Sequence, residues 1–358
     1  MERKYSDQID KQNERKLREI QKELPAFCRE FFIGIEHTTA SRTRLSYAYD
    51  LRLFFRYIQE NNPLYAPDKI SMHDIPIEIL DQIRAVDIEE FLSYIRVYDH
   101  DGNEITNDER GIMRKLSTLR SFFKYYYQKE MIERDPAALV QMPKLHSKNI
   151  IRLDPDEVAL LLDQVESGEG LTDKQKIYHE KTKKRDFALL TLLLGTGIRV
   201  SECVGLNLSD VDFRDNGISV QRKGGSEAIV YFGPEVESAL RDYIEQRKNL
   251  KTAAENEPAL FLSMQGKRIS VRAVENLVKK YAKTVTSLKK ITPHKLRSTY
   301  GTSLYRETGD IYLVADVLGH KDINTTRKHY AAVEEDRRKS AATKVRLRED
   351  DAAESSDS

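Results

Sequence analysis

The stretch from Gln141 to Asn149 divides this chain into two parts with different sequence patterns. It is polar and basic, lacks hydrophobic periodicity and contains Pro143, which is typical of a linker between domains. A chain of 358 residues is long enough for two domains, each with its own core. We therefore predict that residues 141–152 link two separately folded parts.

The part before the linker is predicted to be helical. Apolar residues at steps of three and four mark one buried face of a helix, and this spacing occurs in the segments 17–32, 41–60, 87–98 and 111–128. Pro25 should break the first of these helices, and Asp87 should cap the third. The patterns predict a helical domain over residues 21–140, preceded by a flexible segment over residues 1–20.

The part after the linker mixes helices with short strands. Asp154 and Pro155 begin a helix with a capping side chain and a proline in the first turn. Residues 166–184 form a charged stretch that looks inserted, and a buried helix is expected directly after it, at 186–194. Strands separated by turns are expected at 211–213, 217–221 and 228–232. The predicted fold class is mainly α with a small antiparallel sheet.

The net charge of +1 argues neither for nor against a nucleic-acid partner, because it averages an acidic end with several basic clusters. Residues 349–358 are acidic and are predicted to form a disordered tail. Basic side chains on the predicted helices of the first part are candidates to contact DNA: Arg42, Arg44, Lys115, Arg120 and Lys124. The alternative is that each cluster is an ordinary solvated face.

Cysteine usage and hydropathy limit the environments in which the chain could work. Cys28 and Cys203 are too few for a disulfide framework or a zinc site of the usual spacing. No stretch reaches the apolar length of a membrane span, and the first residues lack the apolar core of a signal peptide. We predict a cytoplasmic protein without a membrane segment or a bound metal.

Five short features of the second part, in a fixed order, could carry chemistry. They contain the side chains Arg199, Lys223, His294, Arg297, His320 and Tyr330. Each alone has an ordinary explanation. Arg199 could form a buried ion pair with Glu202. Lys223 could be a solvent-exposed turn lysine, and His294 could cap a helix. His320 follows a glycine, as at many helix ends, and Tyr330 is one of 18 tyrosines.

Taken together, these side chains suit the cleavage of DNA without a metal ion. Two arginines can hold the non-bridging oxygens of a phosphate with planar, permanently charged groups. Two histidines can exchange protons with the phosphate and the nucleophile. A lysine can protonate the departing 5′ oxygen, and a tyrosine can attack phosphorus to form a covalent intermediate. In the sequence, no carboxylate cluster suited to two-metal chemistry lies near these features.

With these residues in this order, the chain resembles the tyrosine recombinase (phage integrase) family, and within it the bacterial Xer recombinases, over residues 25–345. The run around Arg199 is close to the family's T-G-[LI]-R-V-S-E-L, and Arg222-Lys223-Gly224 stands where the family usually has G-K-G. The stretch 115–125, followed by Asp135-Pro136-Ala137, is similar to the family's core-binding domain.

The resemblance implies a C-shaped clamp on DNA, formed by a SAM-like core-binding domain over residues 21–140 and a catalytic domain over residues 153–348. It implies that Tyr330 forms a 3′-phosphotyrosyl intermediate, that Arg199, Lys223, His294, Arg297 and His320 assist it, and that no cofactor is needed. It also implies a homotetramer on two double-stranded DNA sites, with the segment after Tyr330 docking as a helix on a neighbouring protomer.

Several functions remain open. The resemblance favours chromosome dimer resolution, with stimulation by a DNA translocase, over integration or excision of a phage or conjugative element. A topoisomerase of type IB would share the catalytic residues but relax DNA without site specificity. A protein that only binds DNA is the alternative from another class, although binding alone would not require the whole catalytic set.

Three departures from the family pattern are visible. The family usually places its tyrosine nine residues after the histidine that corresponds to His320; His329 stands there, and Tyr330 comes one residue later. One extra residue would turn a helical side chain by about 100°, but no tyrosine follows Tyr330. The stretch 166–184 resembles the longer single-recombinase type of Gram-positive bacteria. No amino-terminal arm-binding domain like that of the large phage integrases is evident.

Overall fold

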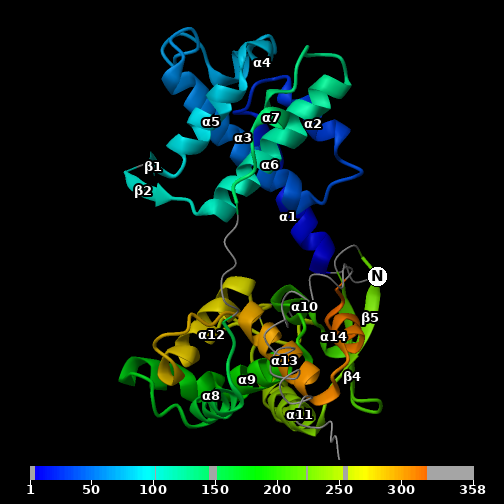
Figure 1. Ribbon diagram of the computed structural model, residues 1–358. Helices are drawn as coiled ribbons and strands as arrows, with labels where there is room; N and C mark the ends of the chain where they lie inside the picture. The colour runs from blue at the N-terminus through cyan, green and yellow to red at the C-terminus, as the bar shows by residue number, and fades with distance from the viewer. Residues whose placement is uncertain (1–4, 101, 145–150, 223–224, 253–256, 321–358) are drawn as a thin grey trace, which may run out of the picture. The chain divides into compact units, whose positions relative to one another are not determined.

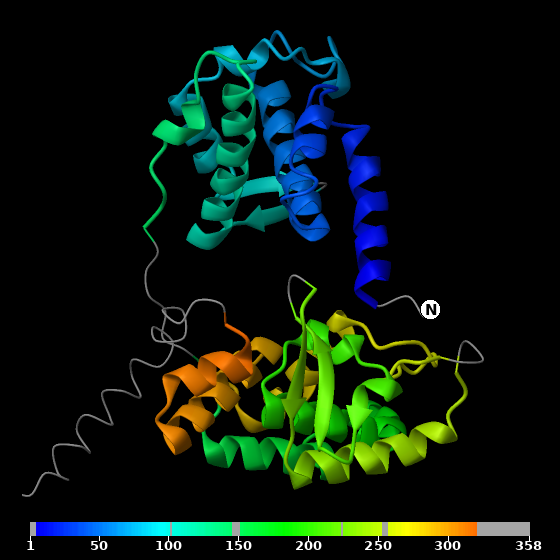
Figure 2. The same cartoon turned by 90° about the vertical axis from the view of Figure 1, so that its right-hand side faces the viewer.

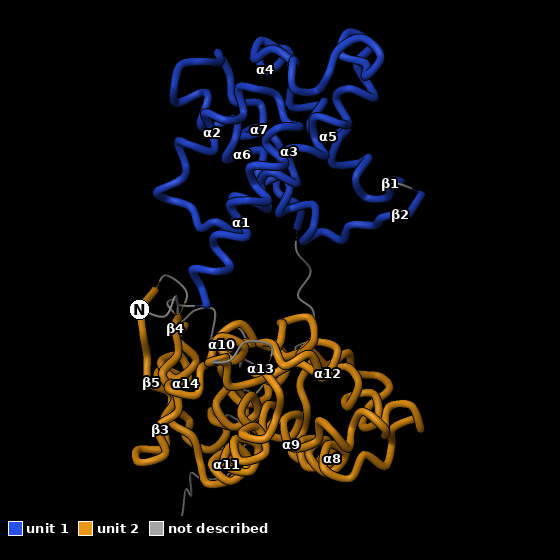
Figure 3. Tube along the Cα trace, turned by 180° about the vertical axis from the view of Figure 1, so that it is seen from behind, with its two compact units in different colours: residues 1–148 blue, residues 149–358 orange. Residues whose placement is uncertain are grey.

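The computed structural model describes residues 5–100, 102–144, 151–222, 225–252 and 257–320. The chain divides into two compact units, residues 1–148 and residues 149–358 (Figure 3). The division falls inside the stretch 141–152 that the sequence suggests as a linker. Each unit is described by itself below.

The described part of the first unit is helical, with one small hairpin (Figure 1). Its helices are α1 (Tyr5–Gln21), α2 (Cys28–Gly34), α3 (Ser41–Asn61), α4 (Ile79–Gln82), α5 (Ala85–Tyr94), α6 (Glu109–Gln128), α7 (Pro136–Leu139) and the 3-10 turn η1 (Met72–Asp74). Strands β1 (Val97–His100) and β2 (Asn103–Thr106) pair antiparallel. The predicted helical character of this part is confirmed, whereas the hairpin was not expected.

Two local predictions for the first unit need correction. The segment 1–20 was expected to be flexible, but α1 occupies most of it, and Leu17 and Ile20 are buried where this helix packs on α3. Asp87 was expected to cap its helix, but Arg84 takes the capping position and Asp87 lies three residues further on, where its carboxylate accepts from the Arg84 backbone N–H at 2.8 Å.

An aromatic cluster forms the core of the first unit. Phe54 and Phe55 of α3 meet Phe122 and Phe123 of α6, with ring centroids of the Phe55–Phe122 pair 6.0 Å apart. These rings are fully buried and pack edge to face, the arrangement that aromatic side chains favour. The helical spacing in the segments 41–60 and 111–128 therefore identified the buried faces of α3 and α6 correctly.

The described part of the second unit combines helices with a three-stranded sheet (Figure 2). The helices are α8 (Pro155–Ser167), α9 (Asp173–Thr196), α10 (Val200–Gly205), α11 (Pro234–Lys248), α12 (Val271–Val285), α13 (Pro293–Thr308), α14 (Ile311–Leu318) and the 3-10 turn η2 (Leu208–Asp210). The strands β3 (Val211–Asp212), β4 (Gly217–Gln221) and β5 (Glu227–Tyr231) follow one another as antiparallel neighbours. The prediction of a small antiparallel sheet is confirmed.

The sequence suggested that the charged stretch 166–184 ends before a separate helix begins at 186. The structure differs from this expectation. Most of it belongs to α9, a single helix of 24 residues. Asp186 explains the continuity: its carboxylate is 1% exposed and accepts hydrogen bonds from Thr182 at 3.0 Å and Tyr281 at 3.0 Å, with Lys280 at 3.3 Å. These bonds fix the middle of α9 to α12, so the charged residues before Asp186 continue the same helix.

His179, on the same helix, should make the second unit sensitive to acid. The imidazole is buried, and its Nδ1 lies 3.0 Å from the Tyr281 hydroxyl. Burial lowers the pKa of His179 below the ordinary value of 6.5. The unfolded chain therefore binds this proton more readily than the folded chain, and stability is lost as the pH falls through 6.5.

We expect His179→Gln to lose less stability than the native chain when the pH falls from 7.5 to 5.5, because glutamine takes up no proton in either the folded or the unfolded state. Urea unfolding at the two pH values measures this difference. An equal loss of stability in the native chain and in His179→Gln would contradict the assignment.

Candidate active site

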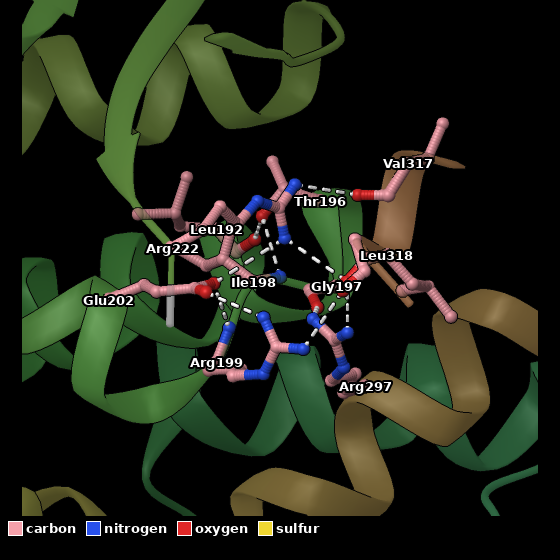
Figure 4. Close-up of polar contacts among 11 residues, drawn as sticks. Leu192, Thr196, Gly197, Ile198, Arg199, Glu202, Arg222, Arg297, Val317 and Leu318 are labelled. Carbon is pink, nitrogen blue, oxygen red and sulfur yellow. Dashed lines mark hydrogen bonds and ion pairs between the residues drawn. The ribbon is translucent and has the colours of Figure 1, made fainter. Parts of the chain in front are cut away.

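Three arginine side chains from separate elements converge on the last carbonyl groups of α14 (Figure 4). Arg297 comes from α13, Arg199 precedes α10, and Arg222 directly follows β4. Gly319 ends α14 with a φ of 60°. The end of a helix leaves carbonyl groups without intrahelical partners and carries a partial negative charge, which suits an arginine cluster.

Arg297 is the most buried of these arginines, with 4% of its surface exposed. Its Nη1 donates to the Gly197 carbonyl at 2.6 Å, and its Nη2 donates to the Leu318 carbonyl. The side chain thus joins the end of α9 to the end of α14 and fixes the direction in which its guanidinium points.

Arg199 makes the ion pair that the sequence offered as its ordinary explanation. Its Nη1 lies 2.7 Å from Glu202 Oε1, its backbone N–H donates to Glu202 Oε2, and its Nη2 donates to the Gly319 carbonyl at 3.2 Å. The Glu202 side chain is 3% exposed, whereas one third of the Arg199 side chain is exposed. The ion pair therefore orients a guanidinium that solvent, and a ligand, can still reach.

Gly197 explains why the chain can place Arg199 and Arg297 together. It ends α9 with a φ of 61°, a conformation that glycine adopts without strain. A Cβ at this position would lie 2.4 Å from Cδ1 of Tyr300 on α13. The turn at Gly197 thus needs a glycine both for its backbone angles and for the close approach of α13.

The two candidate histidines lie on either side of Arg297 in the chain. His294 lies in the first turn of α13, exposed and one turn before Arg297, so the two residues share a helix face. His320 follows Gly319, and its backbone N–H donates to the Ala315 carbonyl at 2.8 Å. Thr292, not His294, takes the capping position of α13.

Lys223, His329 and Tyr330 lie outside the described residues. Their place in the site therefore stays a prediction from the sequence. The described part of the site brings together Arg199, Arg297 and the backbone that precedes His320. A cluster of guanidinium groups with permanent charge can bind the oxygens of a phosphate.

Sequence reasoning missed Arg222, which the structure places in the same cluster. Its Nη1 donates to the Leu318 carbonyl at 3.1 Å and its Nη2 to the Val317 carbonyl at 2.9 Å. The signal was present, because an arginine stands where the resembled family usually has the first glycine of G-K-G.

Three of the five candidate DNA contacts in the first unit make hydrogen bonds or an ion pair within that unit. Arg44 and Lys115 are each 7% exposed: Arg44 pairs with Glu14, and Lys115 donates to the Asn107 side chain at 2.8 Å. Arg120 donates to the carbonyls of Ala137 and Val140. These three side chains are held by contacts within the unit, and their contact with DNA stays a prediction. Arg42 and Lys124 are exposed, as that role requires.

A basic cavity of about 210 Å³ lies between α3, α6 and the β1–β2 hairpin. Its charged lining residues are Asp50, Arg52, Arg56, Arg114 and Lys115, with His100 from the hairpin. Arg114 forms an ion pair with the buried Asp50, whereas Arg56 lies 3.2 Å from Nδ1 of His100. Arg52 and Arg56 were not among the predicted DNA contacts, because the sequence does not show that a hairpin folds beside α3.

Arg120 and Lys124 allow a direct test of whether these contacts stabilise the unit. Arg120→Ala should lower the stability of the first unit by about 1–3 kcal/mol, because the carbonyls of Ala137 and Val140 lose a charged donor. Lys124→Ala should leave stability within about 0.5 kcal/mol, because Lys124 is exposed. Urea unfolding measures both changes. Similar stability of the two variants would show that the Arg120 contacts do not stabilise the unit.

Comparisons with known proteins point to one family. Residues 152–337 match the model of the phage integrase family. The tyrosine recombinase XerC of Caldanaerobacter subterraneus subsp. tengcongensis is 33% identical over 308 residues, which cover 83% of this chain and 81% of that relative.

Solved structures share the fold. The XerH site-specific recombinase bound to palindromic difH substrate has a TM-score of 0.62 at 18% identity, over 85% of this chain and 80% of that one. The Tn1549 transposon integrase in complex with circular intermediate DNA has a TM-score of 0.60 at 21% identity, over 85% and 94%. Within the described residues, no helix is long and apolar enough to cross a membrane.

Proposed function

This chain belongs to the phage integrase family, and on that premise we propose that it is a site-specific tyrosine recombinase that cleaves and rejoins DNA. One observation carries the proposal beyond family membership. Arg199 and Arg297, about a hundred residues apart in the chain, meet at the end of α14 directly before His320. Two fixed guanidinium groups beside a histidine are suited to a phosphate that gains charge during its transfer.

The proposed reaction is a transesterification. The phenol oxygen of Tyr330 bonds to phosphorus while the bond from phosphorus to the 5′ oxygen breaks, which leaves a 3′-phosphotyrosyl link. Arg199 and Arg297 neutralise the non-bridging oxygens, and Lys223 gives a proton to the departing 5′ oxygen. His294 and His320 accept and donate protons around the phosphate. A 5′ hydroxyl then attacks the phosphotyrosine, so the number of ester bonds is unchanged.

The domain organisation of the proposal follows the same division of the chain. Residues 21–140 bind the DNA and residues 153–348 carry out cleavage, joined by the linker 141–152, so that the two domains enclose the duplex. Four protomers act on two recombination sites, and the segment after Tyr330 docks on a neighbouring protomer. The protein acts in the cytoplasm, where the chromosome lies.

The proposed biological role is chromosome dimer resolution, with a DNA translocase as partner. Its support is the similarity to XerC over most of both chains. The second candidate is the integration or excision of a mobile element, which the fold shared with the Tn1549 transposon integrase supports. A recombination site near the replication terminus would favour the first role, and a site at the boundary of an element would favour the second.

Covalent capture tests the proposal directly. The native chain is mixed with sheared DNA of its host in EDTA and without nucleotide, denatured in SDS, and the protein-bound DNA is sequenced. We expect one enriched sequence, linked to protein at its 3′ ends and with free 5′ hydroxyls. Capture spread evenly over the genome would indicate a type IB topoisomerase instead. If no DNA is captured in SDS while a filter-binding measurement without SDS retains DNA, the chain binds DNA without cleaving it.

A further inference from the structure

We propose that Arg222 is a positioning residue that fixes the β4–β5 hairpin to the C-terminal end of α14, and that DNA cleavage depends on this attachment through the neighbouring Lys223. The inference rests on the proposed function. It concerns a residue that differs from the family pattern, because glycine usually stands at this position.

The side chain of Arg222 connects two segments that are far apart in the sequence. Its two terminal nitrogens donate to separate carbonyls, Val317 at 2.9 Å and Leu318 at 3.1 Å. A forked guanidinium can hold two acceptors in a fixed geometry, which a glycine cannot do and a lysine does poorly. The contact therefore determines both the distance and the orientation between the end of β4 and the end of α14.

The backbone of Arg222 is held at the same time. Its N–H donates to the Ser226 carbonyl at 2.7 Å, and its carbonyl accepts from Gly225 N–H at 3.1 Å. These bonds lie where strands β4 and β5 enter the turn that connects them, next to the last strand pair, Gln221 and Glu227. We call this end of the strands the hairpin base. Because both the backbone and the side chain of Arg222 are hydrogen-bonded, the hairpin base cannot shift relative to α14 without breaking hydrogen bonds.

Gly319 provides the surface on which the guanidinium lies. A Cβ at position 319 would be 2.9 Å from Cζ and 2.9 Å from Nη1 of Arg222. Any side chain at Gly319 would therefore displace the guanidinium from its present place. The close approach makes Gly319 a second site at which the attachment can be broken without altering the hairpin.

Glu202 ties the attachment to the arginine cluster. Its Oε2 lies 3.7 Å from Nη1 of Arg222, and its Oε1 lies 2.7 Å from Nη1 of Arg199. The Arg222 side chain is 10% exposed and that of Glu202 is 3% exposed. One buried carboxylate thus contacts both arginines, and it links Arg222 at the end of β4 to Arg199.

Covalent geometry extends the consequence to Lys223. Consecutive Cα atoms lie about 3.8 Å apart, so fixing Arg222 limits where the next residue can be. A general acid must come within hydrogen-bond reach of the oxygen that it protonates. We infer that the attachment limits the positions from which Lys223 could protonate the departing 5′ oxygen. Loss of the attachment should therefore slow protonation of that oxygen rather than weaken phosphate binding.

A sulfur leaving group tests this division of roles. A nicked duplex carrying the captured site is made with either oxygen or sulfur as the bridging 5′ atom. Sulfur needs no proton, since a thiol has a pKa of about 8.5. We expect Arg222→Gly to cleave the oxygen substrate about 10- to 100-fold more slowly than the native chain. This loss is smaller than the full rate contribution of a general acid, because Lys223 itself remains. The sulfur substrate should be cleaved within about twofold of the native rate.

The controls separate the possible failures. Lys223→Ala should also recover on the sulfur substrate, whereas Arg214→Gly, an exposed arginine in the β3–β4 turn, should match the native chain on both. Recovery on sulfur also demonstrates that Arg222→Gly is folded. Equal slowing of Arg222→Gly on both substrates, or none on either, would overturn the inference, as would a Lys223→Ala protein that sulfur does not recover. Failure of the native chain to cleave either substrate would instead refute the proposed function.

A double-mutant cycle tests the contact itself. Gly319→Ala should slow cleavage of the oxygen substrate because the added methyl group displaces the guanidinium. In Arg222→Gly the space is empty and only the backbone strain of alanine at a φ of 60° remains, so adding Gly319→Ala should cost less than it does in the native chain. Independent effects of the two changes, multiplying in the double variant, would show that the residues do not act through one contact.

Discussion

A Tyr330→Phe protein should bind the captured DNA site as tightly as the native chain and form no covalent adduct with it. Phenylalanine keeps the ring but lacks the phenol oxygen that is proposed to attack phosphorus. Binding depends on contacts with the DNA that this oxygen does not make, so affinity and catalysis should separate. Gel-shift titration measures the first, and SDS-stable adducts on a nicked duplex measure the second.

The offset of one residue makes His329 the necessary control. It stands at the position where the family usually has its tyrosine, and histidine is itself capable of attacking phosphorus. We expect His329→Gln to form adducts, because Tyr330 remains. Adducts in Tyr330→Phe that disappear when His329→Gln is added would move the nucleophile to His329. Peptide mapping of the native adduct distinguishes the phosphotyrosine from a phosphohistidine.

The sequence proposed a catalytic set but could not predict how its described members are arranged. Arg199, Arg297 and His320 were recognised from short local patterns and from their order. Their convergence could not be predicted from spacing, because Arg199 bonds to a carbonyl 120 residues away and Arg222 to one 96 residues away. The same limit explains why Arg222 was missed: its two carbonyl partners belong to α14, which comes much later in the chain.

The candidate DNA contacts in the first unit show a second limit of sequence reasoning. Helical periodicity identified the apolar faces of α3 and α6, and basic residues outside those faces were taken to be free. Arg120 is instead held by carbonyls 17 and 20 residues further on, and Arg44 by Glu14, 30 residues before it. A period of 3.6 residues predicts which face is apolar, but not which polar neighbour covers the rest of the helix.

The same reasoning accounts for the elements that were missed. The segment 1–20 is rich in charge and was expected to be flexible, yet Leu17 and Ile20 are buried where α1 packs on α3. The stretch 166–184 also looked inserted because of its charges. Thr182 and Asp186 make it part of α9 through buried hydrogen bonds, which a count of charged residues does not reveal.

Replacing Arg297 with alanine should reduce the rate of DNA cleavage by about 10³-fold, close to the effect of removing one oxyanion donor. It should also destabilise the second unit by about 1–3 kcal/mol, because the Gly197 and Leu318 carbonyls lose a charged donor in the interior. Arg297→Lys keeps the charge but loses the fork, and should fall between the native chain and Arg297→Ala in both quantities.

A matched variant separates catalysis from folding. Arg247 on α11 is also a buried arginine that donates to backbone carbonyls. Its Nη2 lies 2.7 Å from the carbonyl oxygens of both Glu257 and Ala259. Arg247→Ala should lose a similar amount of stability and yet cleave DNA at nearly the native rate under conditions where it is folded. Single-turnover cleavage at saturating DNA, combined with urea unfolding of each variant, makes the comparison. If Arg297→Ala cleaves as fast as Arg247→Ala at equal folded fraction, Arg297 serves only to join α9 to α14, and the transferred phosphate depends on Arg199 alone.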